Sequence, residues 1–278
     1  MQPIKVPWLT KKSIAAAAAG VITDYEAKIK RRVLPPISVE KIIERGLSLK
    51  LGFIDLRKKL ELDDVLGATF VKEGLIYVDR SLTENQNEGR LCFTVAHETG
   101  HWVLHRELVD QACRTGGGGG FIRLRRNKLE PADLNDFESD LGQNSKADCC
   151  GAISPSTFQQ SEGGFIFCRI RDAKEPIEWQ ADFFAACLLM PEDKVREAFR
   201  LVWNAGSLVI TNRRSALGGT ALCVDPCVEN WPLVADMVCE AGNFRNVSKQ
   251  AMIIRLQELG LVANLAGEEI GWKNRSAG

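Results

Sequence analysis

The three histidines of the chain lie within nine residues, at positions 97, 101 and 105, and a glutamate follows the first of them. This spacing constrains the local fold, because residues four apart share one face of an α-helix and lie about 6 Å apart along its axis. Two imidazoles placed in this way can converge on one metal ion, each nitrogen about 2.0–2.1 Å from it. We therefore expect a helix over about 90–105 that presents His97 and His101 as metal ligands. Glu98 would stand beside them as the base that takes the proton of a metal-bound water.

A catalytic zinc ion needs a third protein ligand and an open fourth position. His105 would lie about 12 Å along the helix axis from His97, so one ion cannot touch both, and we expect a supporting role or a surface position for it. Glu178 is the better candidate, because it shares one helical face with Asp182 in an apolar segment, where carboxylates are seldom unpaired. Glu178 would bind the metal, and Asp182 would accept the ring N–H of a ligand histidine. The alternative is that both are exposed carboxylates on an amphipathic helix.

Apolar periodicity and turn signals indicate a chain of mixed helices and strands. Besides the histidine helix, the elements expected before residue 195 are helices over 10–31 and 176–189 and β-like runs over 47–54, 65–71 and 75–78. The five glycines from Gly116 to Gly120 are costly to order, so residues 106–175 are expected to be a partly mobile insertion. The pattern predicts an α+β fold with a small antiparallel sheet and active-site helices in residues 1–195, followed by a helical region over 196–278.

The C-terminal region contains two helical stretches, over 235–241 and 248–259. The second stretch resembles the second helix of a helix-turn-helix, with Ser248 as its N-cap. Lysine plus arginine and aspartate plus glutamate both total 36, so no excess of basic residues attracts nucleic acid. We therefore expect this region to pack or to dock a substrate, and direct DNA binding is the open alternative.

The N-terminal residues and the cysteines indicate the compartment. An apolar run from Ile14 to Ile22 follows two lysines, as in a signal peptide, but it is mostly alanine and lacks a clear cleavage site, which favours a plain helix. No stretch approaches the roughly 20 apolar residues that a membrane span needs. Nine cysteines, an odd number in a chain of 278 residues, do not indicate a secreted disulfide scaffold. We expect a cytoplasmic protein that does not bind a membrane.

Three segments resemble the ImmA/IrrE family of gluzincin metallopeptidases, namely residues 67–79, 90–105 and 178–191. The resemblance covers roughly residues 10–195 apart from the insertion, and it is specific because the histidine segment and the glutamate segment occur together. It implies a zincin-like domain with Zn²⁺ as its cofactor, held by His97, His101 and Glu178. Members of this family typically cleave a helix-turn-helix repressor and so relieve transcriptional repression during stress.

These observations predict a zinc endopeptidase, a hydrolase that acts on one specific protein substrate, expected to be a helix-turn-helix repressor. Glu98 would accept a proton from the attacking water and pass it to the leaving amine. The alternative is a regulator that binds DNA or a repressor on the same scaffold without cleaving. The residue that stabilises the transition state is left open, with Tyr77 or an arginine of the insertion as candidates. A cysteine that shields the zinc is a further open alternative, at Cys149, Cys150 or Cys168.

Overall fold

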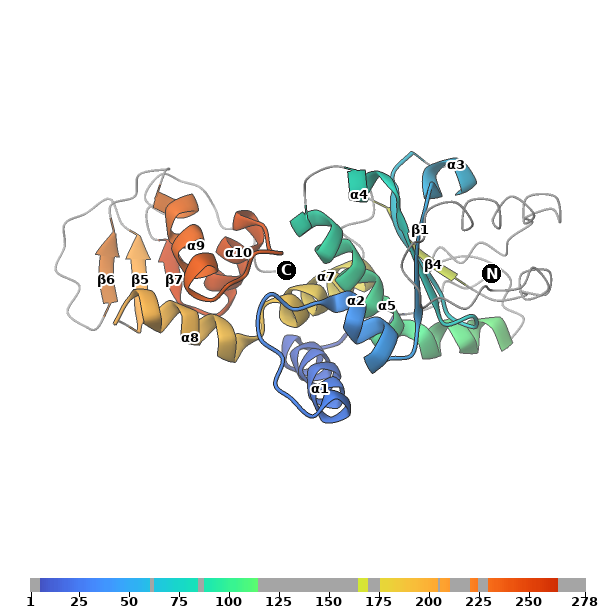
Figure 1. Ribbon diagram of the computed structural model, residues 1–278, viewed down its shortest axis with the longest axis horizontal. Helices are drawn as coiled ribbons and strands as arrows, with labels where there is room; N and C mark the ends of the chain where they lie inside the picture. The colour runs from blue at the N-terminus through green and yellow to red at the C-terminus, as the bar shows by residue number, and fades with distance from the viewer. Residues whose placement is uncertain are drawn as a thin grey trace.

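The structure, a computed structural model, describes residues 6–60, 63–84, 88–114, 165–169, 176–204, 206–210, 221–224 and 230–264. Helices and strands are mixed in an α+β arrangement. Figure 1 shows two parts. One holds the helices α1 (Lys11–Ile29), α5 (Glu88–Arg114) and α7 (Pro176–Leu189) and a first sheet, and the other holds α9 (Asn230–Ala241), α10 (Lys249–Glu258) and a second sheet. Helix α8 (Glu192–Val202) leads from one part to the other. None of the helices in these ranges has the length and apolar character needed to cross a bilayer.

The first sheet has four strands, which are β1 (Lys50–Ile54), β2 (Val65–Phe70), β3 (Leu75–Asp79) and β4 (Phe165–Arg169). Their order is β1-β3-β2-β4, and β2 runs antiparallel to both β3 and β4. β1 and β3 run parallel, because the chain passes through α3 (Leu56–Leu60) and the reversed strand β2 between them. The sheet is therefore mixed, and the β1–β3 pair departs from the predicted antiparallel sheet.

The two faces of this sheet differ. Thr69 of β2 pairs with Ile76 of β3, and Ala68 pairs with Tyr77, so each pair shares one face. The face with Thr69 lies against α5 (Glu88–Arg114), since the Thr69 hydroxyl reaches Glu98 of that helix. The face with Tyr77 has its own small apolar cluster. Only the first face adjoins the histidines.

Three long helices pack together beside the sheet. α1 (Lys11–Ile29) begins at Thr10, whose side chain accepts a hydrogen bond from the Ser13 amide, and its buried face packs on α7 (Pro176–Leu189). α5 and α7 pass close to each other at Gly100, where a Cβ atom would lie 3.2 Å from both the Cα and the carbonyl oxygen of Ala181. This close approach brings the histidines of α5 next to the carboxylates of α7. The short elements α2 (Val39–Lys41), η1 (Ile42–Gly46) and α4 (Ser81–Glu84) complete this part.

The ends of the predicted insertion belong to the regular structure. α5 continues beyond His105 to Arg114, because Val109 is buried in a cluster with Ile166 and Ile177. Residues 165–169 form β4 and extend the sheet. Regular structure therefore reaches into the expected 106–175 segment from both ends. Residues 115–164 and 170–175 lie outside the described residues. The five glycines are among them, so the expected mobility of this segment stays a prediction.

The described residues of the second part form three helices and three strands. They are α8 (Glu192–Val202), β5 (Ser207–Ile210), β6 (Ala221–Val224), α9 (Asn230–Ala241), α10 (Lys249–Glu258) and β7 (Val262–Asn264). β5 is the central strand and runs parallel to both neighbours. The helices α9 and α10 occupy the two predicted helical stretches, and Ser248 caps α10 by accepting from the Ala251 amide. The strands were missed, because three or four residues are too few to show a period of two.

Polar side chains connect the second part to the first. The Asn246 amide donates to the Ile37 carbonyl at 2.8 Å, and the Asn243 amide donates to the Pro35 carbonyl at 2.9 Å. Arg255 of α10 is buried and donates from Nε to the Met190 carbonyl at the end of α7, at 3.1 Å. α10, the helix that resembles a recognition helix, therefore contacts the first part through Arg255. The expectation that this region packs or docks a substrate stays a prediction.

Candidate metal centre

His97, His101 and Glu178 bring their ligand atoms together between α5 and α7. The two Nε2 atoms of the histidines lie 2.9 Å apart. Glu178 places Oε2 3.1 Å from Nε2 of His97 and Oε1 3.6 Å from Nε2 of His101. All three side chains are buried. The structure thus brings together the three residues that the sequence predicted as ligands.

These distances fit a metal ion. Nitrogen and oxygen ligands about 2.0–2.1 Å from a tetrahedral ion are separated from one another by about 3.3 Å. The three observed separations, 2.9, 3.1 and 3.6 Å, lie on both sides of this value. The donor set, two imidazoles and a carboxylate, is also one that zinc prefers. Within the described ranges it is the one group of three or more such side chains that could hold a metal ion.

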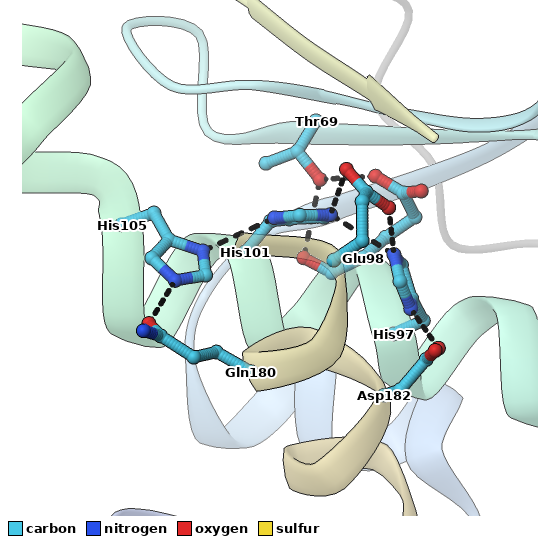
Figure 2. A network of polar contacts seen from close by, with 8 residues as sticks. Thr69, His97, Glu98, His101, His105, Gln180 and Asp182 are labelled. Atoms are coloured by element: carbon cyan, nitrogen blue, oxygen red, sulfur yellow. Dashed lines mark hydrogen bonds and ion pairs between the residues drawn. The ribbon is translucent and has the colours of Figure 1, made fainter. Parts of the chain in front are cut away.

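Asp182 supports His97 from one turn further along α7. Its Oδ1 lies 2.8 Å from Nδ1 of His97, and Figure 2 shows the carboxylate at the edge of that ring. An ionised carboxylate can only accept, so Nδ1 of His97 donates and Nε2 faces the other ligands. The Asp182 side chain is 43% exposed, so this support stands at the border with solvent. Its position is the one predicted from the spacing with Glu178.

Glu98 is fully buried beside the cluster and is held on one side only. The Thr69 hydroxyl lies 2.7 Å from its Oε2, whereas Oε1 has no hydrogen-bond partner among the described residues. Oε1 lies against Gly67 of β2, where a Cβ atom would come within 2.4 Å of it. Gly67 and Thr69 are two apart and therefore share a face of the strand. β2 thus fixes one oxygen of Glu98 and leaves room for the other.

Burial acts to raise the pKa of both glutamates and the neighbouring rings act to lower it, but the net shifts have opposite signs. The pKa of Glu98 is raised, because burial disfavours its charged form more than His101 and His97 favour it. Burial also acts to raise the pKa of Glu178, but the interactions with His101 and His97 outweigh it, and the pKa lies below the usual range. A carboxylate that is ionised at neutral pH and faces two imidazoles is suited to bind a cation.

His105 is buried and lies behind His101, away from the three ligand atoms. Its Nδ1 is 3.1 Å from Nδ1 of His101, and its Nε2 is 3.0 Å from Oε1 of Gln180 (Figure 2). Burial, and next the interaction with His101, lower the pKa of His105 to about 3, so the ring is neutral at pH 7. His105 is therefore not a ligand of this cluster, in agreement with the distance argument, and it is not at the surface.

Three site residues were missed by the sequence reasoning. Gly67 and Thr69 carry a usable signal, since they alternate on a strand that precedes the histidine helix. Gln180 carries none, because a glutamine two residues after Glu178 has no chemistry that distinguishes it in sequence.

The remaining candidates from the sequence are the residues proposed to stabilise the transition state and the cysteines proposed to shield the zinc. Tyr77 is on the opposite face of the sheet from Thr69, with its ring edge-on to Phe70 and burial raising its pKa to about 12. It is not placed to stabilise a transition state at Glu98. The arginines of the insertion, and Cys149 and Cys150, lie outside the described residues, and nothing is described of the side chain of Cys168 in β4.

The comparisons with known proteins add no family to these observations. No protein-family model matches the chain, and no curated protein matches it significantly. Fold and site together define an α+β protein with a buried group of two histidines and one glutamate that could hold a metal ion.

Proposed function

We propose that the chain is a zinc-dependent endopeptidase that hydrolyses a peptide bond in a specific protein substrate. The observation that carries the proposal is that only one of the two carboxylate oxygens of Glu98 has a hydrogen-bond partner among the described residues. Its Oε2 is bound by Thr69, and its Oε1 is buried and has no partner in the part of the chain that the structure describes, beside three side chains that could hold a metal. A buried polar atom without a partner costs free energy and calls for an explanation, and here it lies beside side chains that could hold a metal ion. A base that must bind and deprotonate a water supplies that function.

Each residue then has a defined role. His97, His101 and Glu178 would hold Zn²⁺, which when bound polarises the scissile carbonyl and lowers the pKa of water toward about 7. Glu98 accepts the proton of the attacking water at Oε1, while Thr69 keeps the carboxylate in place through Oε2. The same carboxyl group then donates the proton to the leaving amine. Asp182 keeps Nδ1 of His97 protonated and the ring in position.

The substrate class comes from the resemblance to the ImmA/IrrE metallopeptidases. Those enzymes typically cleave a helix-turn-helix repressor, and we propose the same class of cytoplasmic substrate here, with transcription during stress as the regulated process. Asn246 and Arg255 of the C-terminal region donate hydrogen bonds to the first part of the molecule, and we take these contacts to favour a structural or docking role over DNA binding. The rival function is a regulator that binds DNA or a repressor and does not cleave.

The test compares wild type with Glu98→Gln and Glu178→Ala. Glu98→Gln cannot accept a proton but leaves the ligands intact, so zinc content should be near wild type while turnover falls by about 10²–10⁴-fold. Glu178→Ala should lose both zinc and activity. Zinc is measured by mass spectrometry, and cleavage is measured by labelling the new protein N-termini that appear in a lysate of the source organism. If wild type and Glu98→Gln produce the same N-termini, the peptidase proposal fails and the rival gains support.

A further inference from the structure

We propose that His105 and Gln180 are positioning residues that fix the ring protons of His101, so that its Nε2 lone pair faces the metal position. The inference rests on the proposed function, since it concerns the ligand set of the same site. It is carried by a row of hydrogen bonds that begins at the backbone carbonyl of Pro7 and ends at His101. The direction of every bond in the row follows from its first member.

The Pro7 carbonyl can only accept a hydrogen bond. The side-chain nitrogen of Gln180 lies 2.9 Å from it and donates, so the amide oxygen of Gln180 is turned toward His105. That oxygen can only accept, and Nε2 of His105, 3.0 Å away, must therefore donate. A neutral imidazole with its proton on Nε2 has a bare Nδ1, which can only accept.

The row of hydrogen bonds ends at His101. Its Nδ1 lies 3.1 Å from the bare Nδ1 of His105, so it must carry the proton and donate. Nε2 of His101 is then left with a lone pair, directed toward Nε2 of His97 and Oε1 of Glu178. His97 is placed in the same way by Asp182, so two ring lone pairs and one carboxylate face one another at 2.9–3.6 Å. Three acceptors at these distances repel unless a cation lies between them.

The N-terminal segment holds the first member of the row in place. Trp8, next to Pro7, stacks on Trp179 of α7 with the rings 5.2 Å apart and 4° from parallel. Trp179 is next to Gln180, so the stack and the Pro7–Gln180 hydrogen bond join the same two segments. His97 is supported by a carboxylate at the solvent border, and His101 by the buried, uncharged side chains of His105 and Gln180, whose row ends on the backbone carbonyl of Pro7.

Ring-nitrogen NMR of protein labelled with ¹⁵N-histidine tests the assignment directly, because the chain has only three histidines. With zinc bound, His97 and His101 should carry the proton on Nδ1, and His105 should carry it on Nε2 with Nδ1 bare. In metal-free protein His105 should keep the same tautomer. A His105 ring with its proton on Nδ1 would overturn the inference. A wild-type protein that binds no zinc would instead overturn the proposed function, and the metal-free spectrum would still decide the tautomer.

A matched pair of variants separates positioning from packing. His105→Asn and His105→Leu have the same branched shape and leave the same space, but asparagine offers an oxygen near the position of Nδ1 and leucine does not. His105→Leu should weaken zinc binding by about 10–100-fold, as expected for a lost hydrogen bond to a ligand, and His105→Asn should recover much of this loss. Zinc affinity is measured by competition with a coloured chelator. Equal affinities, or tighter binding by His105→Leu, would show a packing role only.

The control is Thr99→Val, which removes one buried hydrogen bond on the same helix, from Thr99 to the Val95 carbonyl, without touching the row. Its zinc affinity should equal that of wild type. If Thr99→Val weakens zinc binding as much as His105→Leu, the effect of His105 is general loss of helix stability and the inference fails.

Discussion

Buried polar side chains in the two parts of the molecule differ in where their hydrogen bonds end. Around α5 and α7 the side chains of His97, His101 and Glu178 converge on one another. Around α9 and α10 the buried side chains of Asn246 and Arg255 donate to backbone carbonyls of the first part, at Ile37 and Met190. With the ring tautomers proposed above, the first arrangement brings acceptors together, whereas in the second each side chain donates to a backbone carbonyl.

This difference separates a site from an interface. Buried acceptors that face one another cost stability until a cation joins them, so the first arrangement, with the proposed ring tautomers, fits a site that could hold a metal ion. Hydrogen bonds from a donor to an acceptor stabilise the fold without further help. Changes near α5 should therefore alter chemistry more than stability, and changes near α10 should do the reverse.

The largest effect on chemistry outside the ligands and the base is expected at Gly67. In Gly67→Ala the new methyl group would lie 2.4 Å from Oε1 of Glu98, which is too close, so Glu98 must move. Because Glu98 is buried and bound to Thr69, this movement disturbs its position in the site. A displacement of about 1 Å can cost about 10²-fold in rate. Turnover should fall by about this factor, measured on the natural cleavage product, while zinc content stays near wild type.

Gly52→Ala is the matched control for this change. It lies in the same sheet, and its methyl group would come within 2.6 Å of the ring of Tyr77, which is also buried. It should destabilise the protein by about 1–3 kcal/mol, as overpacking does, but leave turnover unchanged. If both variants lose activity equally, the contact between Gly67 and Glu98 has no special role.

An intermediate effect, on stability alone, is expected at Arg255. Arg255→Met keeps an unbranched chain but removes the donor to the Met190 carbonyl, so the free energy of unfolding should fall by about 1.5–3 kcal/mol. Arg196 makes the same kind of bond to the Leu259 carbonyl, but from a half-exposed position. Arg196→Met should cost about 1 kcal/mol or less. Urea unfolding measures both, and a loss of zinc from Arg255→Met would contradict the separation of the two parts.

The site was more readable from the sequence than the fold around it. His97, His101, Glu178 and Asp182 could be grouped because helical spacing of four residues predicts which side chains share a face, and all four lie on two helices. The role of Glu98 in catalysis stays a prediction. What spacing could not supply was the contact between elements, such as Thr69 against Glu98.

The rest of the fold depended on pairings that a single sequence does not encode locally. Parallel pairing of β1 with β3, and of β5 with β6 and β7, joins segments separated by helices or loops. β1 and β3 were predicted as strands but their parallel pairing was not, and β5, β6 and β7, with three or four residues each, are too short to show a clear alternation. Likewise, helix α5 runs past His105 because Val109 is covered by distant residues, and this tertiary contact sets the helix end.

The smallest effect on stability is expected for two asparagines that connect the second part to the first. Asn246 and Asn243 make the same kind of bond, from a side-chain amide to a backbone carbonyl, at 2.8 and 2.9 Å, but only Asn246 is buried. Asn246→Ala leaves the buried Ile37 carbonyl without its partner and should cost about 1 kcal/mol in the free energy of unfolding. Asn243 has a φ of 58°, which glycine adopts without strain, so Asn243→Gly removes only the amide and should cost a few tenths of that. Urea unfolding of both variants measures the difference, and zinc content should be unchanged in each. An equal or larger loss in Asn243→Gly would mean that burial does not set the strength of these contacts.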